Sequence, residues 1–296
     1  MPPGREVSYL IRGQEICGYE VGSGETTAIL LHGWSSSRFA VSPLFPILSQ
    51  YYRCLAIDLP GYGDSAPLPE RVSIPAYAEL IARLARKVSD RPVVLVGHSM
   101  GGMISLVLAL RYPELVERLI LLCPTISGRL SQRINLTLAP FVILEHFPIT
   151  HALVSLLEPI VPLTDRLLRP SMFADRTRVS EEDYQRIKAD IRRRDQAVVR
   201  AESFWAMRDC DLRGKLAQIN VPSLVIWGME DSIIPLSDAY ALSDEWPEAN
   251  FYIIPQAGHW PHFEMPEITE WCILRFHGEH ARKPYFASST PVLDTL

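Results

Sequence analysis

A serine hydroxyl is the first group in this chain that could carry out covalent chemistry, and its neighbours suit that role. Ser99 lies within Gly97-His98-Ser99-Met100-Gly101, after an apolar run that predicts a strand and before one that predicts a helix. A serine at so sharp a turn has a strained backbone, and a side chain at Gly97 or Gly101 would clash across the turn. The turn raises the hydroxyl above a helix N-terminus, whose N–H groups stabilise negative charge. Ser99 is therefore the predicted nucleophile.

A hydroxyl nucleophile needs a base that takes its proton and an acid that orients the base. Two polar residues stand just beyond later predicted strands: Asp231 follows Gly228, and His259 follows Gly258. Functional groups of an open parallel sheet gather at the carboxyl ends of its strands. We therefore expect Ser99, Asp231 and His259 to meet there as nucleophile, acid and base of an acyl-transfer site.

Other residues compete for these roles. His98 adjoins the nucleophile, but its place on the turn aims it away, and His262 lies three residues beyond His259. The position directly after a glycine favours His259 as the base. For the acid, Glu230 is adjacent to Asp231, and the Gly-x-x-Asp pattern favours Asp231. Three more polar residues are expected to stabilise loops: His32, Asp58 and Asp64.

The elements that must position these groups alternate along the chain, which predicts a mainly parallel, doubly wound sheet with helices on both faces. The fold class is α/β, with about eight strands. The expected strands are Val7–Ile11, Glu15–Val21, Thr27–Leu31, Arg53–Ile57, Val93–Val96, Leu119–Cys123, Pro222–Trp227 and Phe251–Ile254. The expected helices are Val41–Ser49, Ile74–Val88, the segment from Ser99 to Arg111, and Phe263–Phe276, and Pro75 suits a first helical turn.

One long segment breaks this alternation and divides the chain into four parts. Residues 124–213 show no strand pattern, and prolines cut them into short helices, which predicts a helical cap inserted into the core. The core comprises residues 1–123 and 214–277, and residues 278–296 are expected to be a loose tail. Charged residues and prolines interrupt the apolar cap, so no stretch reaches the roughly 18–20 apolar residues that a membrane span needs.

Composition excludes several classes of protein. The chain has 296 residues, 48% of them hydrophobic, and a net charge of −5, so we expect a globular protein and no nucleic-acid partner. The Arg192–Arg194 triplet lies among acidic residues and predicts a solvated helix face. Five scattered cysteines predict neither a metal site nor disulfides. The N-terminus has no signal-peptide core, which favours a cytoplasmic location.

Five motifs together resemble the α/β-hydrolase fold family, and the resemblance spans nearly the whole chain. They are Leu30-Leu31-His32-Gly33-Trp34, Asp58-Leu59-Pro60-Gly61-Tyr62-Gly63-Asp64-Ser65, the serine turn, and the pair Trp227-Gly228-Met229-Glu230-Asp231 and Gly258-His259-Trp260-Pro261-His262. In this family the chain order of the catalytic groups is serine, acid, histidine, as it is here. The motifs specify the fold far better than the substrate.

The resemblance also implies an oxyanion hole. Its two donors would be the backbone N–H of Met100, which follows the nucleophile, and that of Trp34, after the early His-Gly. Some members place the acid after the preceding strand, but here Leu122-Cys123-Pro124-Thr125 offers no carboxylate. Haloalkane dehalogenases and epoxide hydrolases of this fold use aspartate as nucleophile, so Ser99 indicates acyl chemistry instead.

The expected function is cofactor-independent hydrolysis of a small carboxylic ester with an apolar acyl or alcohol group. The cap would line the pocket, and the candidate lining residues are His32, Phe141, Phe147, Leu153, Leu156, Leu157, Phe173, Phe204, Trp205 and Trp260. Alternatives stay open: a carbon–carbon bond hydrolase, a cofactor-free perhydrolase or haloperoxidase, and a non-catalytic ligand-binding member. Relatives of the first kind often have a glycine-rich stretch where this chain has Trp34-Ser35-Ser36-Ser37. The oligomeric state and the acyl-chain length are not predicted.

Overall fold

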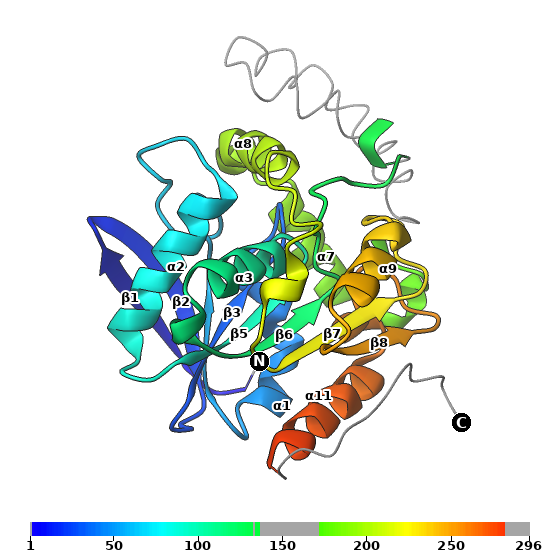
Figure 1. The fold of residues 1–296 in the computed structure, drawn as a ribbon. Helices are drawn as coiled ribbons and strands as arrows, with labels where there is room; N and C mark the ends of the chain where they lie inside the picture. The colour runs from blue at the N-terminus through cyan, green and yellow to red at the C-terminus, as the bar shows by residue number, and fades with distance from the viewer. Residues whose placement is uncertain (1, 133, 137–171, 282–296) are drawn as a thin grey trace.

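An eight-stranded sheet forms the centre of the molecule (Figure 1). The computed structural model describes the chain except residues 1, 133, 137–171 and 282–296. The strand order is β1-β2-β4-β3-β5-β6-β7-β8; β1 pairs with β2, and β2 with β4, in antiparallel register, while all other pairs are parallel. The strands are β1 (Arg5–Ile11), β2 (Gln14–Val21), β3 (Thr27–Leu31), β4 (Arg53–Ile57), β5 (Val93–His98), β6 (Val116–Leu122), β7 (Ser223–Gly228) and β8 (Asn250–Ile254). The predicted fold class and strand number are confirmed.

Helices cover both faces of this sheet, which explains why the central strands are continuous apolar runs. Every residue of β3, β5 and β7 is buried. The buried clusters on the two faces join the strands to different helices: α2, α3 and α9 pack on one face, and α1 and α11 on the other. The helices of the core are α1 (Phe45–Leu48), α2 (Ile74–Val88), α3 (Met100–Arg111), α9 (Leu236–Glu245), α10 (Pro261–Glu264) and α11 (Pro266–Ala281).

Helix boundaries differ from the sequence-based prediction in three places. The predicted helix Val41–Ser49 is a 3₁₀ helix, η1 (Arg38–Leu44), followed by the single turn of α1. Pro43 and Pro46 lack the N–H groups that a continuous α-helix would use. Helix α9 was not predicted, because its apolar residues do not form a clear stripe. The final helix was predicted to end at Phe276, but α11 continues to Ala281.

The described part of the inserted segment is helical and fastened to the core. Its elements are η5 (Arg176–Arg178), α7 (Glu181–Ile191), η6 (Arg194–Gln196) and α8 (Ala197–Arg208). Two single turns lie outside this segment, η2 (Pro113–Leu115) and η7 (Leu216–Gln218). Asp238 of α9 accepts hydrogen bonds from the N–H groups of Ile126 and Ser127, where the segment leaves the sheet. At the other end, the N–H of Leu212 donates to the Ile126 carbonyl, 2.8 Å away. The two ends of the insertion therefore meet beside β6.

One acidic residue near the Arg192–Arg194 triplet is buried, although Arg192 and Arg194 are themselves exposed as the predicted solvated face requires. Asp190 is buried, and its carboxylate accepts a 2.5 Å hydrogen bond from the hydroxyl of Ser37 in the core. Burial raises the pKa of Asp190. The neighbouring acidic residues Glu181, Glu182 and Asp195 are exposed as expected. Among the described residues, no helix is both long and apolar enough to span a membrane.

Candidate active site

The predicted nucleophile lies at a strained turn between β5 and α3. Ser99 has φ 54° and ψ −115°, which is a conformation that non-glycine residues rarely adopt. A Cβ atom at Gly97 would lie 2.5 Å from the Gly101 carbonyl oxygen, and one at Gly101 would lie 2.3 Å from the Leu31 carbonyl oxygen. Both glycines are therefore needed so that α3 can begin directly against the ends of β3 and β5. The predicted steric reason for the motif is present in the structure.

The predicted base and acid meet at the ends of β7 and β8. His259 Nδ1 lies 2.8 Å from Asp231 Oδ2, and both side chains are buried. Asp231 Oδ1 accepts hydrogen bonds from the N–H groups of Ile233 and Ile234, 2.9 and 3.0 Å away. These bonds hold the carboxylate facing the imidazole, and a ring that donates its Nδ1–H to Asp231 has Nε2 free to accept a proton. The described residues show no hydrogen bond from Ser99 to His259; such contacts often tighten only when substrate binds.

The loop after β3 lies against the serine turn, as an oxyanion hole would require. A Cβ atom at Gly33 would lie 3.1 Å from Ser99 Cβ, so the backbone that precedes Trp34 passes beside the nucleophile. Met100 is the first residue of α3, and its N–H has no partner within the helix. The Trp34 side chain points to α8, where its indole N–H donates to the Arg200 carbonyl at 2.8 Å. Trp34 and Met100 thus offer backbone N–H groups near the nucleophile. That these two groups bind an oxyanion remains a prediction.

The competing histidines occupy other positions. His98 Nε2 donates to the backbone carbonyl of His259 at 2.8 Å, and His262 Nε2 donates to the carbonyl of Ala40 at 2.7 Å. Burial lowers the pKa of His98 well below its usual value, and lowers that of His262 to about 4, so both rings are neutral. The described residues show no carboxylate bound to either ring. His259 alone of the three has the acid that orients a base.

His32 was predicted both to shape its loop and to line the pocket. Its ring is fully buried, Nδ1 donates to the Gly33 carbonyl at 2.8 Å, and Nε2 accepts the N–H of Leu59 at 3.0 Å. Burial lowers the pKa of His32, in keeping with this neutral ring. Because both ring nitrogens of His32 form hydrogen bonds with backbone groups, the contacts of His32 are those of a residue that shapes its loop and not of one that lines a pocket.

The structure also shows where the residues that competed with Asp231 as the acid lie. Glu230 is exposed, unlike Asp231. Asp58 is buried and accepts hydrogen bonds from the backbone N–H groups of Arg38 and Asp64, and its side chain forms an ion pair with Arg38. A Cβ at Gly63 (φ 53°) would overlap the Asp58 carboxylate. Asp58 therefore organises this loop, as predicted.

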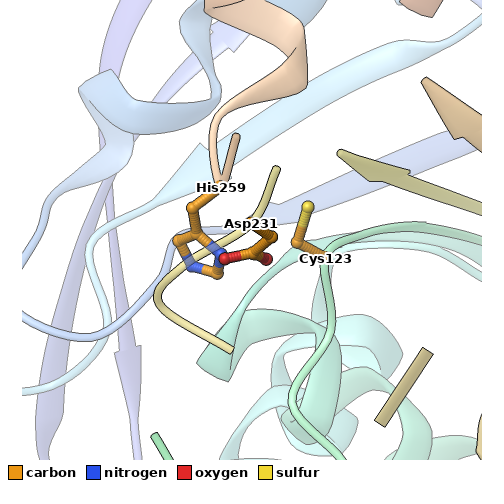
Figure 2. Close-up of side chains that lie close together, drawn as sticks. All are labelled: Cys123, Asp231 and His259. Carbon is orange, nitrogen blue, oxygen red and sulfur yellow. The ribbon is translucent and has the colours of Figure 1, made fainter. Parts of the chain in front are cut away.

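A third polar side chain lies beside the acid and the base. Figure 2 shows the Asp231 carboxylate facing the His259 ring, with Cys123 close by on the end of β6. Ligand atoms of these three residues lie within 4.8 Å of one another, and they are of types that bind metals. However, Asp231 and His259 already share a hydrogen bond, and burial raises the pKa of the Cys123 thiol well above its usual value. That hydrogen bond commits Asp231 Oδ2 and His259 Nδ1 to each other, so the geometry favours an acid–base pair.

The predicted pocket residues fall into three groups. Phe141, Phe147, Leu153, Leu156 and Leu157 lie outside the described residues. Phe204 and Trp205 of α8 pack on each other, and the Phe204 ring centroid lies 5.9 Å from that of Trp34. This brings α8 to the proposed oxyanion loop. Trp260 is 6% exposed and packs against His98 and Phe173, with centroid distances of 4.6 and 6.2 Å.

A cavity of about 620 Å³ opens elsewhere, between the start of α2, the end of α3 and the segment after α8. None of Ser99, Asp231 or His259 lines it, so we do not assign it to the substrate.

Sequence reasoning missed one buried group next to the base. Glu264 of α10 is 2% exposed, and its carboxylate accepts hydrogen bonds from backbone N–H groups on both sides of His259. A glutamate at the end of one helical turn carries no spacing signal, and only the folded chain places it there.

Comparisons with known proteins define the class. The alpha/beta hydrolase fold family matches residues 28–266. The chain is 32% identical over 259 residues to the uncharacterized hydrolase YugF of Bacillus subtilis, covering 86% of this chain and 90% of that protein. The chain therefore belongs to the α/β hydrolase fold family.

Two further relatives have named reactions. A 2-hydroxy-6-oxononadienedioate/2-hydroxy-6-oxononatrienedioate hydrolase of Paraburkholderia phymatum is 27% identical over 270 residues, covering 88% of this chain and 90% of the relative. A pimeloyl acyl-carrier protein methyl ester esterase of Yersinia enterocolitica is 26% identical over 263 residues, covering 86% and 94%. One relative is named as a hydrolase of 2-hydroxy-6-oxo acids and the other as a methyl ester esterase, so the comparisons support a hydrolase without choosing the bond.

Proposed function

We propose that this protein hydrolyses carboxylic esters through an acyl-enzyme formed on Ser99. The observation that carries the proposal is the pairing of His259 with Asp231 at 2.8 Å, at the same edge of the sheet as the strained serine turn. An ordinary surface serine has neither the strained turn nor an oriented base. The esterase of Yersinia enterocolitica lends further support.

In the first half-reaction, Ser99 Oγ attacks the carbonyl carbon while His259 Nε2 takes the hydroxyl proton. The carbonyl oxygen becomes an oxyanion, which the N–H groups of Met100 and Trp34 stabilise. Collapse of this intermediate breaks the bond to the alcohol, and the imidazolium returns the proton to the departing oxygen. Asp231 stays ionised and stabilises the imidazolium.

In the second half-reaction, water attacks the acyl-enzyme and gives a proton to His259 Nε2. Collapse of the second intermediate releases the carboxylic acid, and the proton returns to Ser99 Oγ. This sequence needs no cofactor. Phe204 packs on Trp34, and Trp205 packs on Phe204, so these rings bring apolar surface of the inserted segment to the oxyanion loop, where an apolar substrate group would lie.

Ser99→Ala tests the proposal. Loss of the nucleophile should lower kcat for p-nitrophenyl butyrate on the order of 10⁶-fold and abolish labelling by a fluorophosphonate probe. Ser243→Ala, at an exposed position of α9, should leave both unchanged. Turnover by Ser99→Ala at the wild-type rate would overturn the assignment, and failure of the wild-type protein to react with the probe would indicate a non-catalytic member. A series of p-nitrophenyl esters from acetate to palmitate would then define the acyl chain.

A carbon–carbon bond hydrolase is the second candidate, and the relative from Paraburkholderia phymatum favours it. The same three residues would act on a vinylogous diketone. Against it, the chain after His32-Gly33 is Trp34-Ser35-Ser36-Ser37, without a further glycine. The two candidate functions are distinguished by measuring kcat/KM for a 2-hydroxy-6-oxo-dienoate and comparing it with kcat/KM for the best ester. Hydrolysis of the dienoate is measured as the loss of its visible absorbance. A higher value for the dienoate would replace the ester proposal.

A further inference from the structure

A buried carboxylate lies directly behind the predicted base. Glu264 ends α10, is 2% exposed, and accepts four backbone N–H groups. Oε1 lies 2.9 Å from Gly258 N and 3.4 Å from Trp260 N, while Oε2 lies 2.7 Å from Ala174 N and 3.3 Å from Asp175 N. The shorter bond on each oxygen is the stronger one.

These four donors come from two separate parts of the chain. Gly258 and Trp260 are the immediate neighbours of His259, so Oε1 binds the peptide units that carry the base. Ala174 and Asp175 belong to the inserted segment, just before η5. One carboxylate therefore joins the loop of the base to the cap.

The two segments are in close contact at this point. A Cβ at Gly258 would lie 2.8 Å from Ala174 N and 3.1 Å from Glu264 Oε1, so only glycine allows both approaches. The Trp260 ring packs on Phe173, one residue before Ala174, with a centroid distance of 6.2 Å. The contact is thus apolar on one side of the loop and made of hydrogen bonds on the other.

The charge of Glu264 is compensated by backbone dipoles. Among the described residues no cationic side chain forms an ion pair with it. Burial raises the pKa of Glu264, and the N–H groups of Asp175, Gly258, Ala174 and Trp260 oppose that rise. Since both carboxylate oxygens accept N–H groups, these contacts favour the ionised form of Glu264 and oppose the effect of burial.

We propose that Glu264 is a positioning residue: its carboxylate holds residues 258–260 so that the His259 imidazole faces both Asp231 and Ser99, and fastens that loop to residues 174–175 of the cap. Glu264 acts through His259 and does not touch substrate. The catalytic part of this inference rests on the proposed function, whereas its structural part does not.

Glu264→Gln is the decisive variant because it preserves size but replaces one acceptor oxygen with an NH₂ group. Whichever way the amide turns, its NH₂ faces backbone N–H donors, and one of the two segments loses its acceptor. Glu267→Gln, three residues away and exposed at the start of α11, is the matched control. Misplacing a catalytic group by about 1 Å can cost on the order of 100-fold. We expect kcat to fall about 10- to 100-fold in Glu264→Gln, with little change in KM for a short ester, and to stay unchanged in Glu267→Gln.

A double-mutant cycle separates positioning from general loss of structure. If Glu264 acts through His259, then Glu264→Gln should lower the residual rate of His259→Ala by less than threefold, because the base that it positions is already gone. An equal loss in both backgrounds would overturn the proposal.

Proton NMR gives a readout that is independent of catalysis: the far-downfield resonance of the His259 Nδ1–H that is bonded to Asp231. The resonance is assigned by its disappearance from the spectrum of His259→Ala. We expect it to shift or broaden in Glu264→Gln and to remain in place in Glu267→Gln. Should the wild-type protein neither hydrolyse esters nor bind the fluorophosphonate, the proposed function fails while this measurement still tests Glu264. If Glu264→Gln does not fold, Glu264→Asp, which keeps both acceptors one methylene further back, replaces it. An unchanged resonance in the folded variant would refute the positioning role.

Discussion

Replacing Asp231 with asparagine tests the acid–base geometry most directly. Oδ1 accepts the N–H groups of Ile233 and Ile234 at 2.9 and 3.0 Å, so the amide oxygen of the variant should take that side. The NH₂ group then faces His259 Nδ1, where the carboxylate oxygen lay at 2.8 Å. As a donor, it requires an unprotonated Nδ1 and so moves the ring proton to Nε2.

A ring protonated at Nε2 cannot accept the serine proton, so the variant should fold normally but turn over slowly. The comparable change in a serine protease lowers kcat by about 10⁴-fold, or about 5 kcal/mol of transition-state stabilisation. The assay is kcat for p-nitrophenyl butyrate, together with the rate of fluorophosphonate labelling and a thermal unfolding curve.

Glu230→Gln is the control, because the adjacent carboxylate is exposed and was the rival acid. It should change kcat by less than about threefold, as surface substitutions rarely do more. If Asp231→Asn retains kcat within tenfold of the wild type, the tautomer argument is wrong. If Glu230→Gln shows the large loss instead, the acid has been misassigned.

Two other predictions concern stability. Gly97→Ala places a Cβ 2.5 Å from the Gly101 carbonyl oxygen, so urea denaturation should show a loss of about 1–3 kcal/mol; an unchanged midpoint would contradict the steric account of the turn. Burial lowers the pKa of His262 from 6.5 to about 4, so between these pH values the unfolded chain binds the proton and the folded protein does not. Stability should therefore fall as the pH drops through this window, by about 3 kcal/mol in all from this residue. His262→Phe should reduce that dependence by this amount in urea denaturation at stepped pH, while His32 and His98, whose pKa burial also lowers, still contribute the rest. An equally steep dependence in the variant would show that His262 contributes nothing to it.

Much of the sheet could be predicted because its strands are buried on both faces. Residues 27–31 and 53–57 were predicted as strands with the bounds that β3 and β4 have, since apolar runs closed by glycine or aspartate leave little choice. The helix Ile74–Val88 was equally clear, because its apolar residues repeat on one face and Pro75 marks its start. Helix α9 lacks such a stripe and was missed.

The candidate site was only partly accessible to sequence reasoning. The strand-end positions of Asp231 and His259 indicated that they would meet, and the structure places them 2.8 Å apart. Asp190 and Glu264 offered no such signal. Each is a carboxylate whose burial depends on a distant partner: Ser37 for Asp190, and Ala174 for Glu264.

The sequence by itself determined the fold class and the residue types for acyl transfer. Hydrophobic periodicity and glycine positions are local properties, and they specify where strands end and which side chains follow them. Only the tertiary structure decided which histidine has a carboxylate partner. It also decided that His98 bonds to backbone, and that Glu264 joins the loop of the base to residues 174–175. Burial and hydrogen-bond partners depend on contacts between residues far apart in the chain, and a local pattern holds no information about them.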